Sequence, residues 1–275
     1  MNAIAGWVIA AVLGPFAAWP PLVGMTVMAL LTAIVLLIAF KWTSNQRAIA
    51  DAKRQVQAGL FELRLFQDDP RLMARAAGGL LLQQARYLRY AFVPVLWVFL
   101  PLSILIAHLD TYYSVDALHP GASAIVIVHT TGDGGTLTLE APPGLRVETP
   151  CVWAPSRREG AWRIAADREG DYNLRVTWPG ASAPLTKQVR VTRADATPTN
   201  IARPSVRPAG RTWDEFLHPG ESPLPPDAPI DAIAITYPPR ALDVGFGFTL
   251  PWVITFLLIT TAIMLVLRPF LRVTF

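Results

Sequence analysis

Three long apolar runs without a charged residue decide what kind of protein this chain can be. They cover residues 3–40, 91–109 and 244–267, and Trp19-Pro20-Pro21 interrupts the first of them. About 20 consecutive apolar residues are needed to cross a ~30 Å hydrocarbon layer as a helix. Since 52% of the whole chain is hydrophobic, we expect an integral membrane protein rather than a soluble domain.

The first apolar run allows two interpretations. Only 16 residues precede the Trp-Pro-Pro break, and Gly14-Pro15 interrupts even those, so residues 1–21 are short for a crossing. They form either an interfacial or re-entrant segment or an additional span, and we favour the first. The spans are then expected at 22–40, 90–109 and 244–267, with the N-terminus outside.

The charges between the spans predict the topology. Residues 41–89 carry nine basic and four acidic residues, a balance of +5, whereas residues 110–243 carry 13 basic and 16 acidic residues, a balance of −3. By the positive-inside rule, 41–89 and the tail 268–275 are cytoplasmic and 110–243 is extracytoplasmic. We therefore expect a multi-pass protein of the cell membrane (inner or plasma), with the lipid bilayer as a partner. The basic character needs no nucleic-acid partner to explain it.

Residues 41–89 are expected to form a cytosolic basic helical hairpin. In the first arm, apolar residues recur at spacings of three, four and seven, which places them on one face of a helix. Asp69 followed by Pro70 is typical of a helix start, so the second arm should begin there. The arms either rest on each other or on the membrane surface, or they contact a substrate or ribosome. The residues of this candidate partner-binding face are Ile49, Val56, Leu60, Leu63 and Phe66.

Residues 110–193 have a different pattern. Six short runs of alternating polar and apolar residues lie between 122 and 193, separated by Gly, Pro and Asp turns, which is typical of strands. We expect an immunoglobulin-like β-sandwich, in which Glu169-Gly170-Asp171-Tyr172 resembles the approach to a tyrosine corner. Residues 194–243 are expected to be a proline-rich segment with a late strand at 230–237.

No set of residues points to covalent chemistry. The four histidines are scattered without the spacing of metal ligands, and no nucleophile, phosphate-loop or zinc-protease motif is present. Cys151 is the only cysteine, so the extracytoplasmic part cannot contain an intrachain disulfide. We expect no catalytic residues, no metal, no cofactor and no enzymatic activity.

Three segments resemble the YidC/Oxa/Alb insertase superfamily, particularly its three-span, archaeal-type members. The first is the passage from an apolar helix into a charged helix at residues 31–57. The second is Tyr90-Ala91-Phe92-Val93-Pro94-Val95-Leu96, followed by Leu100-Pro101. The third is the aromatic-rich run 252–272, which ends in Leu-Arg-Pro-Phe-Leu-Arg. The β-sandwich occupies a place where the short members of the superfamily have only a brief loop.

The resemblance implies three core helices around a cytosol-open groove that eases a hydrophobic segment sideways into lipid. Its partners would be nascent membrane proteins or the ribosome. The alternative is a structural or sensory adaptor that binds an extracytoplasmic protein through the β-sandwich and a cytosolic one through the hairpin. By position only, the candidate groove residues are Arg86, Arg89, Ser103, Thr255 and Thr260.

Overall fold

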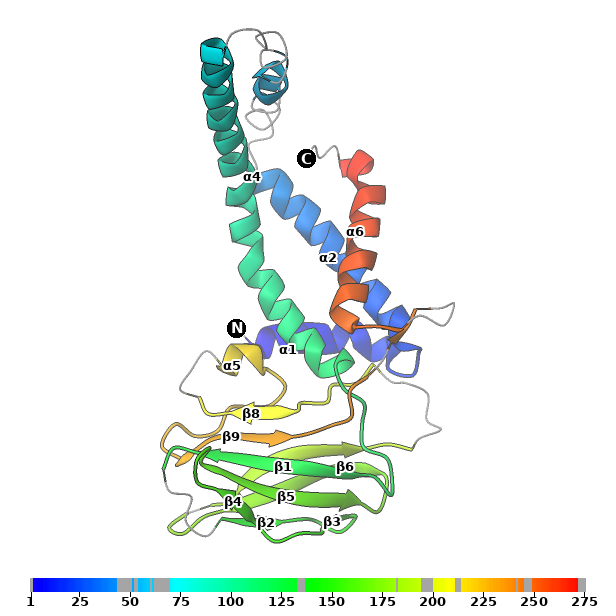
Figure 1. The fold of residues 1–275 in the computed structure, drawn as a ribbon. Helices are drawn as coiled ribbons and strands as arrows, with labels where there is room; N and C mark the ends of the chain where they lie inside the picture. Colours follow the sequence, from blue (N-terminus) through cyan, green and yellow to red (C-terminus); the bar gives the residue numbers. More distant parts are fainter. Residues whose placement is uncertain are drawn as a thin grey trace. The chain divides into compact units, whose positions relative to one another are not determined.

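The computed structural model describes residues 2–43, 51, 54–59, 61, 70–132, 137–181, 183–193, 200–210, 214–240, 242–244 and 249–271. The chain divides into two compact units. The β unit comprises Met1–Met25 and Ile104–Thr255, and the helical unit comprises Thr26–Ser103 and Phe256–Phe275. Three helices pass from one unit into the other (Figure 1).

Helices form where the apolar runs and the basic segment predict them. Three helices are long and apolar enough to cross a membrane in the described part of the chain, within Pro21–Trp42, Leu96–Tyr113 and Trp252–Phe270. The predicted number of helices of spanning length is thereby confirmed. The helices are α1 (Asn2–Leu13), the 3-10 helix η1 (Gly14–Phe16), α2 (Pro21–Thr43), α4 (Pro70–Tyr113), α5 (Asp214–Leu217) and α6 (Trp252–Leu271).

Helix α4 combines two expected elements in one. It begins at Pro70, where the Asp-Pro pair predicts a helix start, and it runs for 44 residues to Tyr113 without interruption. At ~1.5 Å per residue it is roughly 66 Å long, about twice the thickness of a hydrocarbon layer. The second hairpin arm and the second apolar span are therefore one continuous helix.

Helix α6 begins later than the apolar run that contains it. Strands β10 (Leu242–Asp243) and β11 (Thr249–Leu250) pair with each other first, and the helix starts at Trp252, directly after Pro251. It extends to Leu271 and contains Pro269 near its end. The apolar run at 244–267 and the helix are thus offset, because part of the run is used in a short antiparallel pair.

Besides the β10–β11 pair, the described part of the β unit contains two larger antiparallel sheets. The larger has the order β3-β5-β1-β9-β8, with β4 also paired to β5, and the smaller has the order β2-β6-β7. The strands are β1 (Ser123–Thr130), β2 (Thr138–Glu140), β3 (Leu145–Val147), β4 (Val152–Ala154), β5 (Glu159–Ala166), β6 (Gly170–Thr177), β7 (Leu185–Val191), β8 (Val206–Pro208) and β9 (Ile230–Ile235).

Strands β8 and β9 enlarge the sheet beyond the segment predicted for it. Val126 of β1 pairs with Ile235 of β9, and β8 pairs with the other edge of β9. The β region therefore continues through the proline-rich segment past residue 193. The late strand expected at 230–237 lies between β1 and β8 in the larger sheet (Figure 1).

One hydrophobic core lies between the two sheets. In β1 the burial alternates, with Val126 and Val128 fully buried, and in β6 Leu174 and Val176 are fully buried. Burying one such side chain contributes about 1.5–3 kcal/mol to stability. The period-two pattern of the sequence thus becomes the shared interior of the two sheets.

Candidate functional site

The predicted partner-binding face of the hairpin is described at one of its five residues. Val56 lies in a helical segment and is half-buried, while Ile49, Leu60, Leu63 and Phe66 lie outside the described residues. A Cβ added at Gly59 would lie 3.2 Å from Leu80 Cδ1 and 3.6 Å from Leu80 Cβ. The first arm therefore contacts α4 at this point.

The three hydroxyl residues proposed for a groove hydrogen-bond within their own helices. Ser103 Oγ donates to the Phe99 carbonyl at 2.8 Å, Thr255 Oγ1 to that of Pro251 at 3.3 Å, and Thr260 Oγ1 to that of Phe256 at 2.7 Å. Such bonds satisfy a hydroxyl proton in apolar surroundings. These oxygens can still accept a hydrogen bond, but their protons are already used.

The two arginines proposed for the groove belong to α4. Arg89 is exposed, and the side chain of Arg86 lies outside the described part of the chain. Arg89 comes seven residues before the apolar window that starts at Leu96, so it precedes the spanning part of the helix. That position agrees with a cation near a membrane surface.

An apolar stripe on α4 was not predicted as a unit. Its members are exposed to different extents: Leu81 by 70%, Leu88 by 45%, Phe92 by 56% and Phe99 by 65%. Their spacings of seven, four and seven place them on one helical face. We call these four residues the α4 stripe. The spacing is visible in the sequence, but the apolar run from Ala91 predicts a span by itself, and that prediction divides the stripe between two segments.

The C-terminal end of α4 is held by two arginines from distant parts of the β unit. Arg203 donates its backbone N–H to the Thr111 carbonyl at 2.6 Å and Nη1 to that of Tyr112 at 3.3 Å. Arg240 donates Nη1 to the Tyr112 carbonyl at 3.1 Å and its backbone N–H to that of Ser114 at 3.0 Å. The last carbonyls of a helix lack partners within it and carry partial negative charge, so buried cations suit this position.

The electrostatics of this arginine pair are set by burial. Desolvation, with repulsion from Arg240, lowers the pKa of Arg203 to about 10, which still leaves it charged at neutral pH. Arg240 Nε lies 3.1 Å from an Asp116 carboxylate oxygen. A buried charge is costly without a partner. Here the helix carbonyls and the Asp116 carboxylate are the partners, and they fix the end of α4 within the β unit.

Asn200 joins three other segments of the β unit. Its Nδ2 donates to the carbonyls of Phe16 at 2.8 Å and Trp19 at 3.1 Å, and its Oδ1 accepts from the Tyr113 hydroxyl at 3.0 Å. A Cβ added at Gly24 would lie 2.6 Å from Asn200 Oδ1, so only glycine permits this approach. Asn200 thus ties the turn after α1 and the start of α2 to the end of α4.

Replacing Asn200 with alanine should loosen the turn at residues 14–19. Three side-chain hydrogen bonds are lost, at a cost of about 1 kcal/mol for each bond, although the Phe16 carbonyl keeps the Trp19 N–H as a donor. Hydrogen–deuterium exchange of peptides covering 14–24 should accelerate roughly 10- to 100-fold. Tyr113→Phe removes one of the three bonds and should give a smaller change; equal exchange in both variants would contradict this role of Asn200.

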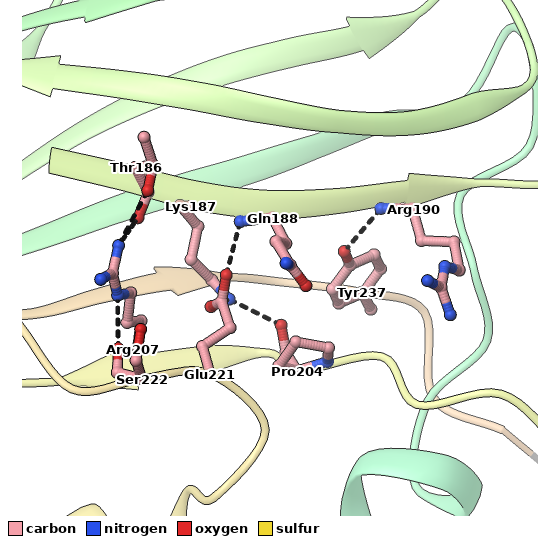
Figure 2. Close-up of polar contacts among 9 residues, drawn as sticks. All are labelled: Thr186, Lys187, Gln188, Arg190, Pro204, Arg207, Glu221, Ser222 and Tyr237. Carbon is pink, nitrogen blue, oxygen red and sulfur yellow. Dashed lines mark hydrogen bonds and ion pairs between the residues drawn. The ribbon is translucent and has the colours of Figure 1, made fainter. Parts of the chain in front are cut away.

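Side chains satisfy the outer edge of β7, where none of the strands that the structure describes pairs with it (Figure 2). Glu221 accepts from the Gln188 N–H at 2.7 Å, Tyr237 Oη accepts from the Arg190 N–H at 3.2 Å, and Arg207 donates to the Thr186 carbonyl. An open strand edge is otherwise a template for unwanted pairing. These contacts close the edge without adding a strand.

Lys187 and Glu221 form a buried ion pair beneath this edge. Lys187 is fully buried, and its ammonium contacts the Glu221 carboxylate and the Pro204 carbonyl at 2.7 Å. Desolvation lowers the pKa of Lys187, and the neighbouring Glu221 carboxylate opposes that shift. The pair joins β7 to the segments that precede and follow β8.

A small pocket opens beside the closed edge. Its volume is about 100 Å³, below the several hundred Å³ typical of small-molecule sites. Arg190 and Asp171 form an ion pair in its wall, with Arg190 Nε 2.6 Å from a carboxylate oxygen. The described residues contain no group of three or more metal-ligating side chains. The pocket offers polar contacts rather than a catalytic set.

No protein-family model matches the chain, and a search of curated proteins finds no match either. Among the described residues, two features present side chains to a partner: the exposed α4 stripe of the helical unit and the pocket beside β7 in the β unit.

Proposed function

We propose that this protein is an insertase-like membrane-protein insertion or assembly factor, in which the α4 stripe receives the hydrophobic segment of a client. The observation that carries the proposal is that four exposed apolar residues follow one face of α4, from Leu81 before the spanning window to Phe99 inside it. The resemblance of residues 31–57, 90–101 and 252–272 to the YidC/Oxa/Alb superfamily supports the same role.

The length of α4 explains how such a stripe could work. Its spanning window, Leu96–Tyr113, is 18 residues long, so the helix from Pro70 to Val95 extends roughly another 39 Å. A client segment that meets Leu81 first can move along one continuous helix towards the bilayer. Each apolar side chain that leaves water gains about 1.5–3 kcal/mol, and no covalent chemistry is required.

The proposal includes an orientation. The hairpin and the C-terminal tail are cytoplasmic, because they carry the excess of Lys and Arg, and the β unit faces the outside of the cell membrane. Basic residues of the hairpin, such as Arg89, are suited to contact a ribosome or the start of a nascent chain. We assign the β unit to the immunoglobulin-like sandwiches, since its two antiparallel sheets share one core and Tyr172 makes a corner hydrogen bond to the Arg168 carbonyl at 3.0 Å.

Photocrosslinking from the α4 stripe tests the insertion function. With a photoreactive amino acid at Leu81 or Leu88, we expect adducts with stalled nascent chains that carry an apolar segment, and none with matched chains that lack it. A probe at Arg75, which is exposed and about 120° around the helix from Leu81, is the control. Leu81→Asn with Leu88→Asn should lower the yield from a probe at Phe92 about tenfold or more, given the apolar area removed.

The adaptor function is the second candidate, and the pocket beside β7 favours it. Its wall presents Asp171, Asn173, Gln188 and Arg190, which could hold an extracytoplasmic protein partner. A probe at Gln188 that captures a mature protein, together with probes at Leu81 and Leu88 that capture lipid only, would replace the insertion function with this one.

A further inference from the structure

Helix α1 is apolar on every side but is too short to cross a membrane. Its 12 residues span roughly 18 Å, against ~30 Å for a hydrocarbon layer, and it contains no charged residue. One face packs inward, with Ile9 and Leu13 almost fully buried, whereas Ile4 is 71% exposed, Trp7 72% and Val8 46%. Water is a poor solvent for such a face.

The contacts of α1 fix its position within the β unit. A Cβ added at Gly6 would lie 3.7 Å from the His108 ring, and the carbonyl of Phe16, just beyond α1, is bonded to Asn200, which also binds Tyr113. His108 precedes Tyr113 by five residues, or roughly 7.5 Å along α4. A helix running alongside α4 would place Gly6 roughly 15 Å from Phe16 along that axis.

Helix α1 lies across the end of α4 instead of descending beside it (Figure 1). The exposed residues Ile4, Trp7, Val8 and Ala11 lie on one helical face. That face is turned away from Ile9 and Leu13, which pack inward.

We propose that α1 is an interfacial helix that binds the lipid leaflet on the side of the membrane where the β unit lies, with Ile4, Trp7 and Val8 among the acyl chains. A lipid leaflet is the occupant that fits this face, because the face carries no charge and presents a tryptophan, which favours the boundary between headgroups and hydrocarbon. Asn200 sets the depth of α1 by holding the turn that follows it. The inference does not depend on the insertion function.

The sidedness of α1 can be measured with the single native cysteine. Cys151 is exposed in the β unit, so labelling of the wild type by a membrane-impermeant maleimide in oriented vesicles marks the side of the β unit. In a Cys151→Ser background, Asn2→Cys should be labelled from that same side. Labelling from the opposite side, or from neither side, would overturn the proposal.

Spin labels then measure the depth of the exposed face. Ile4 and Ala11 are seven residues apart on that face, so an interfacial helix should hold the two labels within about 5 Å of each other in depth, and a spanning helix about 10 Å apart. Each label should be accessible to oxygen but shielded from a polar nickel reagent, with a label at Val35 of α2 as the deep reference. A depth difference near 10 Å, or free access of the nickel reagent to both labels, contradicts lipid binding at the interface.

Discussion

Removing either charge of the buried Lys187–Glu221 pair should destabilise the β unit by about 3–5 kcal/mol, whereas removing both should cost far less. Lys187→Met leaves the Glu221 carboxylate without its cation, and Glu221→Gln leaves a buried ammonium without its anion; an isolated buried charge is the expensive state. In Lys187→Met with Glu221→Gln both charges are gone, and Gln can still accept the Gln188 N–H. Denaturation of the detergent-solubilised full chain, followed by tryptophan fluorescence, measures each cost.

The pH dependence of Glu221→Gln supplies an independent check. Burial lowers the pKa of Lys187 from the ordinary value of 10.5, so between the two values the unfolded chain binds more protons than the folded one. Stability must then rise with pH over that interval. Between pH 8 and pH 10, the free energy of unfolding of Glu221→Gln should therefore rise towards that of the double variant. The series stops at pH 10 because burial raises the pKa of Tyr237 to about 12. The stability that the protonated Tyr237 hydroxyl contributes is lost between about pH 10 and pH 12, which would obscure the effect of Lys187. Single-variant costs that simply add in the double variant would contradict this account.

Local patterns in the sequence predict elements whose boundaries depend on neighbouring residues. The alternation from Ser123 to Thr130 predicts β1 with the ends that the structure has, because one face of that strand is buried throughout. Pro70 predicts the start of α4, since proline suits the first turn of a helix. In both places the signal and the element occupy the same residues.

Elements that depend on distant partners could not be predicted. Strand β8 is three residues long and ends at Pro208, so its own sequence argues against a strand, and pairing with β9 stabilises it. Strand β4 is equally short and forms on β5. Thr249–Leu250 of the third apolar run forms β11 and pairs with β10, which lies just before that run, although the composition of the run resembles that of a span.

In the candidate site, too, the sequence predicts local features but not contacts between distant residues. The sequence placed Ser103, Thr255 and Thr260 correctly in apolar helices, but it could not show that each hydroxyl bonds to the carbonyl four residues earlier. Nor could it show that Arg203 and Arg240 reach the end of α4, because these contacts join residues about 90 and 130 positions apart. Ile49, Leu60, Leu63 and Phe66 stay predictions.

Gly144→Ala should be the most damaging glycine substitution in the β unit, at about 3–4 kcal/mol. Gly144 has φ +110, and a Cβ there would lie 2.3 Å from Tyr172 Oη and 2.6 Å from its ring. The backbone conformation alone costs about 1–3 kcal/mol for alanine. The methyl group also displaces the Tyr172 hydroxyl from the Arg168 carbonyl, at a further cost of about 1 kcal/mol. The unfolding free energy of the full chain in detergent measures the total.

Gly121→Ala separates backbone strain from the steric clash. Gly121 has φ +87, but a Cβ there would have no atom within 4 Å, so only strain should appear, about 1–2 kcal/mol. Tyr172→Phe removes the corner hydrogen bond alone and should cost about 1 kcal/mol. If Gly144→Ala acts by displacing Tyr172, then Tyr172→Ala must cost less in the Gly144→Ala background than in the wild type, because contacting residues are not additive. Equal costs in the two backgrounds would show that strain at Gly144, and not the tyrosine contact, fixes this corner of the sandwich.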